Sequence, residues 1–354
     1  MEKLRDMWQG QVQRLRDMRD DWRADLAAGS YGVKSLIAAL IVYLLVAFGF
    51  GIYWSSEPEQ FSVRDTMAQT YGADDKVTGV AVTGTLIEVG DTLLTKRGGF
   101  LSNDIFPPGV WLDNIPNWEY GVLIQMRDLS KAMREAFSRS QSQSTEDSAL
   151  ALAESRFNFD HDSWAVPASE SEYKEGLKYL RDYQKRLMDE DRHNAQFFAR
   201  ADNLRYWLNT VETRLGSLSQ RLSASVGQRR LNVDLAGEER ASQSTQTPRE
   251  MVIKTPWFEI DDVFYEARGS TWALIHFLKA VEEDFADVLA RKNALVSLQQ
   301  IIRELEATQQ TVYSPMILNG SGFGMLANHS LVMASYISRA NAAIIDLREL
   351  LAQG

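Results

Sequence analysis

The sequence predicts an all-α fold in which one transmembrane helix is followed by an elongated antiparallel bundle of long helices. Residues 35–54 contain no charged side chain, and a helix of that length rises ~30 Å, enough to cross the hydrocarbon core of a bilayer. Beyond them, apolar residues recur at steps of three and four, the period of an amphipathic helix. A buried core helix is the alternative for 35–54, but no second segment is equally apolar to pack against it.

Composition excludes several classes of protein. A mean hydropathy of −0.28 is that of a soluble body with one membrane segment, not of a multi-pass transporter. The 354 residues include no cysteine, so disulfides, thiolate nucleophiles and cysteine-bound metals are excluded. The net charge is −10, and because residues 1–34 carry +1, the part after the apolar segment carries −11. Such an acidic body repels phosphate backbones, so we expect no nucleic acid partner.

Residues 1–34 are predicted to form a cytoplasmic segment with one amphipathic helix. Over 1–27, apolar side chains that include Trp8 and Trp22 fall on one face at steps of three and four. The helix would either lie on the cytoplasmic leaflet, with both indoles at headgroup depth, or pack as a soluble helix on itself or on another copy. The sequence leaves these alternatives open.

Charge around the span predicts its orientation. Seven Lys/Arg side chains precede it, whereas Arg64 is the only basic residue in 55–73. By the positive-inside rule, the N-terminus is cytoplasmic and residues 55–354 form a helical domain on the outer side of the membrane. A cleaved signal peptide is the alternative, but the apolar stretch has full membrane length and no A-x-A site follows it. We therefore expect an uncleaved signal anchor.

The outer domain is predicted to start with a short helix at 61–71 and a longer one at 78–96. A pair of glycines would end the longer helix, as glycine often does at helix C-termini. Residues 100–116 carry three prolines and no sustained period, which predicts an ordered loop. Asn117 would cap the next helix. The buried stripe of that helix would consist of Val122, Met126, Leu129, Met133 and Phe137.

Two stretches of the chain resemble a known family. They are TGTLIEVGDTLLTKRGGFLSNDIFPPGVWLDNIPNWEYGVLIQMRDLS at 83–130 and FEIDDVFYEARGSTWALIHFLKAVEEDF at 258–285. Both are similar to a family of single-pass inner-membrane proteins of Gram-negative bacteria that carries only a domain-of-unknown-function label. The similarity covers most of the chain. It implies a bacterial inner-membrane location with the outer domain in the periplasm, and it implies no activity and no site residues.

The second half of the chain predicts further long helices. Helices are expected at 148–157 and around 173–187, and a heptad seam follows, which predicts helices packed nearly parallel within one chain or between chains. Residues 228–250 turn polar and lose their period, so a flexible excursion is expected there. Asp261 would cap another long helix, and a final helix would cover 333–351. The seam consists of Phe197, Ala201, Leu204, Leu208, Val211, Leu215, Leu218 and Leu222.

Three carboxylates in and beside the proline-rich loop are the weak catalytic candidates. Asp104, Asp113 and Glu119 could supply an acid and a base for cleaving a glycan such as peptidoglycan. The alternative is structural, because Asn103-Asp104 and Asp113-Asn114 suit Asx turns and Glu119 suits a helix N-terminus.

The same loop concentrates apolar and aromatic side chains. If exposed, they would form an interface for a partner protein, because tryptophan anchors dominate interface energies. If buried, they would close the end of the bundle nearest the membrane. The interface candidates are Phe106, Pro107, Pro108, Trp111 and Trp118.

Other motifs favour structural roles. Asp160-His161-Asp162 has no partner histidine at metal-ligand spacing, and His276 lies on an apolar helix face, so we expect no metal ion and no cofactor. The run Gly320 to Gly324 lacks the Lys-Ser/Thr ending of a phosphate loop. Within the span, the small residues Ala47 and Gly51 would allow close packing against a second copy in a homo-oligomer.

The predicted function is that of a membrane-anchored periplasmic scaffold or adaptor, which contacts the lipid bilayer and binds other envelope proteins. Two alternatives stay open at this point. One is a peptidoglycan-directed hydrolase that uses the loop carboxylates, and the other is a ligand-binding sensor that signals through the span.

Overall fold

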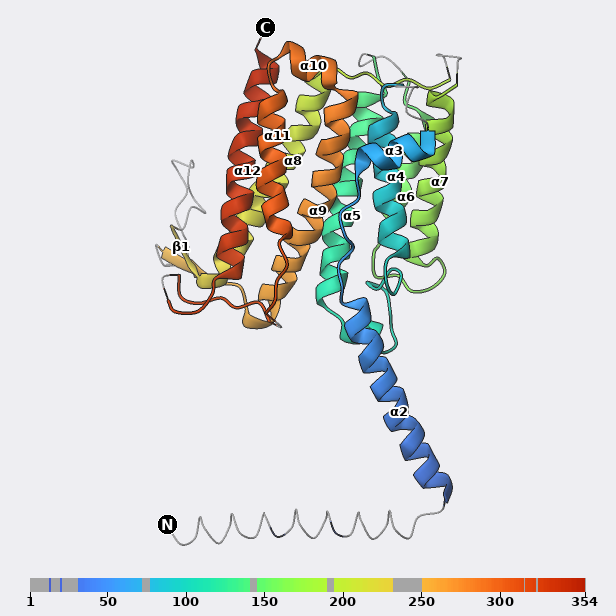
Figure 1. The fold of residues 1–354 in the computed structure, drawn as a ribbon, viewed down its shortest axis with the longest axis vertical. Helices are drawn as coiled ribbons and strands as arrows, with labels where there is room; N and C mark the ends of the chain where they lie inside the picture. The colour runs from blue at the N-terminus through green and yellow to red at the C-terminus, as the bar shows by residue number, and fades with distance from the viewer. Residues whose placement is uncertain are drawn as a thin grey trace, which may run out of the picture. The chain divides into compact units, whose positions relative to one another are not determined.

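A computed structural model describes residues 13, 20, 31–71, 77–140, 145–189, 194–231, 250–314, 316–322 and 324–353. It divides into two compact units, Met1–Tyr53 and Trp54–Gly354, and Figure 1 shows that the described residues of both are mainly helical. The amphipathic helix predicted over 1–27 lies outside the described residues except for Gln13 and Asp20. The all-α prediction is confirmed.

The first unit contains α2 (Tyr31–Trp54), the helix predicted from the uncharged stretch. Within the described part of the chain, α2 is the one helix long and apolar enough to cross a membrane, over Lys34–Trp54. Length and composition suit both a membrane anchor and a signal sequence. Most of its large side chains are exposed, whereas Ala47 and Gly51 are buried.

The second unit is a bundle of long helices around one hydrophobic core. Trp118, Trp207 and Trp272 are among its largest fully buried side chains. The predicted helix at 148–157 is found with the same bounds. The helices of the bundle are α3 (Val63–Tyr71), α4 (Val80–Thr95), α5 (Asn114–Ala132), α6 (Ser148–Phe157), α7 (Ser169–Leu187), α8 (Ala201–Ser223), α9 (Ile260–Asp284), α10 (Ala286–Arg291), α11 (Leu295–Glu306) and α12 (His329–Ala352).

Helices α5 to α9 reverse direction at each connection, so α5 and α9 run parallel although sequential neighbours are antiparallel. Asn117 Nδ2 donates to Asp262 Oδ1 at 2.8 Å, and eight residues further along both helices Gln125 Nε2 donates to Ser270 Oγ at 2.8 Å. The indole rings of Trp118 and Trp272, on the same two helices, lie 5.2 Å apart. This parallel pair forms the centre of the bundle (Figure 1).

The heptad seam packs within one chain. Its leucines on α8 are buried against α12, which runs in the opposite direction. Ser219 Oγ lies 2.6 Å from Ser338 Oγ, whereas Glu212, two turns earlier on α8, pairs with Arg348, nearly three turns later on α12. The seam therefore uses an intramolecular partner in this structure.

An extended strap, residues 55–62, connects the end of α2 to α3 and lies along α9. Glu57 pairs with Arg268, and four residues later Phe61 N–H donates to His276 Nε2 at 3.1 Å. The other ring nitrogen of His276 lies 2.7 Å from the Trp272 carbonyl oxygen, and burial lowers the pKa of His276 to about 4. His276 is thus the satisfied core histidine that the sequence predicted.

Several local predictions need correction. Asp113, not Asn117, caps α5, because its carboxylate accepts the Asn114 N–H at 2.9 Å. Asp261 lies in the first turn of α9 rather than at its cap, and no side chain caps that helix. The helix predicted at 78–96 is confirmed as α4, with slightly shorter bounds.

The predicted excursion at 228–250 begins and ends in an antiparallel ribbon. Strand β1 (Gln228–Leu231) pairs with β2 (Glu250–Ile253), and Gln228 lies opposite Ile253. Residues 232–249 lie outside the described residues. The polar composition predicts no pairing here, because the residues of these strands whose burial is described are exposed or half-buried and impose no period of two.

The half-buried carboxylate of Asp284 joins the last turn of α9 to the first turn of α4. Asp284 accepts the backbone N–H groups of Gly79 and Val82, both at 2.7 Å. The N-terminal N–H groups of a helix have no partner within it, so Asp284 supplies the cap that the chain before α4 lacks. Burial raises the pKa of Asp284 to about 7, although these N–H donors favour the ionised form.

Asp284→Asn should remove a pH dependence of stability. An unfolded aspartate titrates near pH 4, so a folded-state pKa of about 7 means that folding takes up a proton between these values. The free energy of unfolding of the native chain, relative to that of the variant, should therefore fall as pH rises from about 4 to about 7. Urea denaturation of both chains across this range measures it, and parallel pH profiles would contradict it.

Candidate functional site

The bundle has two ends with different surfaces. The base is formed by the loops at 96–113, 158–168, 254–259 and 307–328, and the head is formed by the segments 194–200 and 285–294 with the end of α12. In Figure 1 the head is the end marked by α10. The sequence-predicted site residues belong to the first base loop and the start of α5.

A buried ion pair between Lys96 and Glu119 fixes the position of the first base loop. Lys96 Nζ lies 2.6 Å from Glu119 Oε1, and their side chains are 2% and 0% exposed. Glu119 also accepts the N–H groups of Leu101 and Ser102, each at 2.8 Å, and the Ser102 hydroxyl at 2.5 Å. Burial raises the pKa of Glu119, while Lys96 and these donors oppose the rise. Glu119 therefore positions the loop through these bonds, and its side chain has no contact with solvent.

The other two carboxylates lie in different surroundings. Asp113 is exposed and caps α5. Asp104 is half-buried beside Gly109, and burial together with the charge of Glu170 raises its pKa. Because one of the three candidates is buried, one caps a helix and one is half-buried, they do not line one open site.

The neighbour of Asp104 on α7 was missed by the sequence analysis. Glu170 accepts a hydrogen bond from Asn103 Nδ2 at 2.7 Å, and the same amide donates to the Ser163 carbonyl oxygen at 2.8 Å. These bonds tie the first base loop to the second. No local signal could have found Glu170, because the fold alone brings α7 to this loop.

The apolar loop residues divide between the two predicted roles. Trp118 and Pro108 are buried and close the core, as expected for a plug. Phe106 and Trp111 are 73% and 52% exposed, as expected for an interface. Pro107 is half-buried. Trp118 therefore presents no surface to a partner in this structure.

The remaining motifs have structural partners. The His161 ring lies 4.9 Å from the Tyr120 ring, and the Asp160 carbonyl oxygen accepts the Ser169 hydroxyl at 2.7 Å. In the glycine run, Asn328 bonds the Gly320 N–H and the Gly322 carbonyl oxygen, both at 2.7 Å. The described residues include no group of three or more His, Cys, Asp or Glu placed to hold a metal ion.

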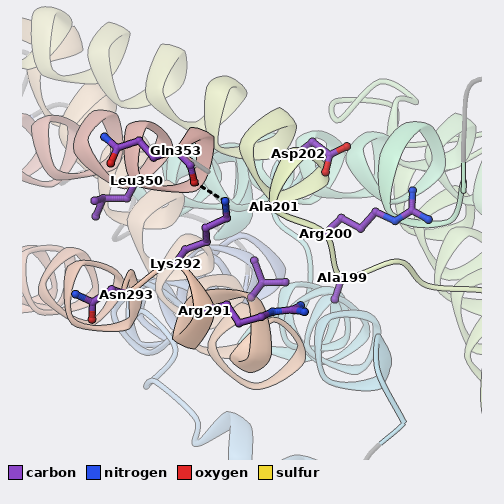
Figure 2. Close-up of a pocket in the computed structure, with 10 residues that line it drawn as sticks. Ala199, Arg200, Ala201, Asp202, Arg291, Lys292, Asn293, Leu350 and Gln353 are labelled. Atoms are coloured by element: carbon purple, nitrogen blue, oxygen red, sulfur yellow. Dashed lines mark hydrogen bonds between the residues drawn. The ribbon is translucent and has the colours of Figure 1, made fainter.

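A cavity of about 710 Å³ opens at the head, and we call it the head pocket (Figure 2). Three cations and one carboxylate, Asp202, line it. Arg200 precedes the first turn of α8, whereas Arg291 and Lys292 end α10. The lining also includes Ala199, Ala201, Val288, Asn293, Leu350 and Gln353.

The cations of the head pocket donate to main-chain oxygens. Arg200 Nη1 bonds the Ser140 carbonyl oxygen at 2.6 Å, and Lys292 Nζ bonds that of Gln353 at 2.5 Å, the dashed line in Figure 2. Arg291 Nε bonds the Asp287 carbonyl oxygen at 3.2 Å. A carbonyl oxygen accepts a hydrogen bond without neutralising the cation. No local pattern in the sequence indicates this pocket, because its lining comes from separate segments.

Comparison with known proteins adds a family. A model described as "Uncharacterized protein conserved in bacteria (DUF2333)" matches residues 9–354. The chain belongs to this family. The match to DUF2333 includes α2 as well as the bundle, so the apolar helix and the helical body belong to one conserved unit. No curated protein and no solved structure matches the chain.

Proposed function

We propose that this DUF2333 protein is a membrane-anchored helical adaptor of the bacterial cell envelope. In this proposal α2 is an uncleaved anchor in the inner membrane, the N-terminus is cytoplasmic and the bundle is periplasmic. The head pocket binds an acidic segment of a partner protein. The observation that carries the proposal is the head pocket itself, which gathers three cations in a chain whose net charge is −10.

The head pocket has an excess of positive charge. Three of its ten lining residues are cations and one is a carboxylate. Each of the three cations also donates a hydrogen bond to a carbonyl oxygen. A concave surface with a net positive charge attracts acidic ligands and selects against basic ones. An acidic segment is the class of partner that suits it.

The loop carboxylates support an adaptor rather than the hydrolase alternative. Glycan cleavage needs two carboxyl groups flanking one bond in an accessible site. Glu119 is buried in an ion pair and Asp113 caps α5, so each already has a structural task.

Charge reversal in the head pocket should abolish partner binding. A photo-crosslinking residue in place of Asn293, which lines the pocket, should capture a protein in cells through an acidic segment. With Arg291→Glu and Lys292→Glu added, capture should fall at least about tenfold, because steering and contact both lose their attraction. Arg200→Glu, on a different element, should act in the same direction.

Arg303→Glu is the matched control for Arg200→Glu, because it makes the same single charge reversal at an exposed position of α11 outside the pocket. Capture should persist in this variant. Equal capture in the pocket variants and in the control would refute the head pocket as the partner site.

The anchor and its direction have a separate test. The positive flank before α2 predicts that a reporter active only in the periplasm, fused after Gly354, is active in cells. A reporter active only in the cytoplasm should be silent at the same position. The reverse pattern would overturn the proposed topology.

A further inference from the structure

The exposed tryptophan and phenylalanine side chains of the bundle lie at one end. Among the described residues outside α2, the tryptophans and phenylalanines with large exposed fractions number five, and all belong to base loops. We call them the base aromatic set. The set consists of Phe106 (73% exposed), Trp111 (52%), Trp164 (62%), Trp257 (60%) and Phe258 (88%).

Flexible apolar side chains extend the same surface. The loop before α12 exposes Tyr313, Met325 and Leu326, each by more than half. At the head, by contrast, the described residues expose no tryptophan or phenylalanine, and Val296, which is 74% exposed, lies beside the head in the first turn of α11. The two ends therefore differ in the side chains that they expose. The base exposes aromatic rings, whereas the head contains the basic head pocket.

The base is also where the chain arrives from α2. Trp54, the last residue of α2, belongs to the bundle unit, and its indole lies so close to Gly98 that an added Cβ would be 2.8 Å from the ring. Two residues later, Ser56 Oγ accepts a hydrogen bond from Arg97 Nη1 at 2.8 Å. The last residue of α2 and the residues after it therefore contact the first base loop directly.

We propose that the base aromatic set lies in the headgroup region of the membrane that α2 enters, so that the bundle rests on the lipid surface. The inference depends on the anchor of the proposed function. Aromatic rings are enriched at membrane interfaces because one part of the ring is apolar while the surroundings are wet. Tethering makes the contact intramolecular, so a few rings suffice for a stable contact.

The position of the set selects the bilayer over a protein partner. The rings come from three loops that are distant in the sequence but share the end at which Trp54 enters the bundle. A bilayer would meet every one of these loops, because its surface extends in all directions around the end of the anchor. The head pocket, at the opposite end, stays open to the aqueous phase in this arrangement.

The test uses the absence of cysteine in the native chain. Single cysteines replace Phe106, Trp164 and Phe258 in the full-length protein, and Val296→Cys is the matched control because Val296 is 74% exposed, against 73% for Phe106. Each is labelled with a fluorophore and reconstituted in phosphatidylethanolamine–phosphatidylglycerol vesicles with brominated acyl chains. Flotation first establishes that the chain is anchored, and circular dichroism establishes that each variant is folded.

Brominated lipid should quench the base labels at least about threefold more than the control label, whereas iodide in the buffer should quench the control more. Base labels that respond to iodide as the control does would overturn the inference. Base labels shielded from iodide but not quenched by lipid would also overturn it, because they would indicate contact with a second copy. Failure to float would refute the anchor itself, a result distinct from both.

Discussion

Replacing Glu119 with alanine should lower the free energy of unfolding by about 3–5 kcal/mol, because it leaves Lys96 as an unpaired cation in the core. Lys96 is 2% exposed and would keep only the Gly99 carbonyl oxygen, at 2.6 Å, as a partner. The N–H groups of Leu101 and Ser102 would lose their acceptor as well. Denaturant unfolding of the full-length chain, followed by tryptophan fluorescence, measures the change.

Two variants separate the ion pair from the loop hydrogen bonds. Lys96→Met combined with Glu119→Gln removes both charges and keeps an acceptor, so it should regain most of the loss, as hydrophobic replacement of buried pairs often does. Asp113→Ala, which removes an exposed cap in the same region, should cost only about 1 kcal/mol. A Glu119→Ala loss no larger than that of Asp113→Ala would refute the structural role of the pair.

Much of the fold could be predicted from the sequence, because periodicity reports the buried face of each helix. The seam on α8 and the core role of His276 both follow from apolar residues at helical spacing. Periodicity does not report which helix covers that face. The parallel pairing of α5 with α9 depends on how many helices separate them, and the partner of the seam, α12, begins more than 100 residues later.

The sites were less predictable than the helices. The sequence located the aromatic loop but could not divide it into the buried Trp118 and the exposed Trp111, because adjacent apolar residues look alike until the loop conformation is known. The Lys96–Glu119 pair and the head pocket have no local signal. Each is assembled from segments that only the tertiary fold brings together.

The proposed partner site at the head and the proposed lipid contact at the base imply the same orientation of the bundle relative to the membrane. Its base would lie on the lipid and its head would extend a basic pocket into the periplasm, about one helix length from the membrane surface. Residues 260–284 of α9 would then set that distance, since a helix of 25 residues spans about 37 Å. The strap that follows α2 contacts this helix at Arg268 and again at His276.

The crossing of α5 and α9 gives the last prediction. A Cβ on Gly269 would overlap the Trp118 carbonyl oxygen, and a Cβ on Gly121 would overlap that of Glu266. The two backbones are in contact, so Gly269→Ala must push the helices apart in the middle of the core. We expect a loss of about 3 kcal/mol in the free energy of unfolding, although alanine is intrinsically better than glycine in a helix by about 1 kcal/mol.

Gly216→Ala on α8 isolates the effect of the close approach. Its Cβ would lie 3.6 Å from Asn341 Nδ2, an ordinary contact, so only helix propensity changes and stability should rise by about 0.5–1 kcal/mol. Denaturant midpoints of both variants should therefore move in opposite directions, although each adds one methyl group to a helix. A stabilised Gly269→Ala variant would show that the helices can separate without cost, and the parallel pair would then not be the rigid centre of the bundle.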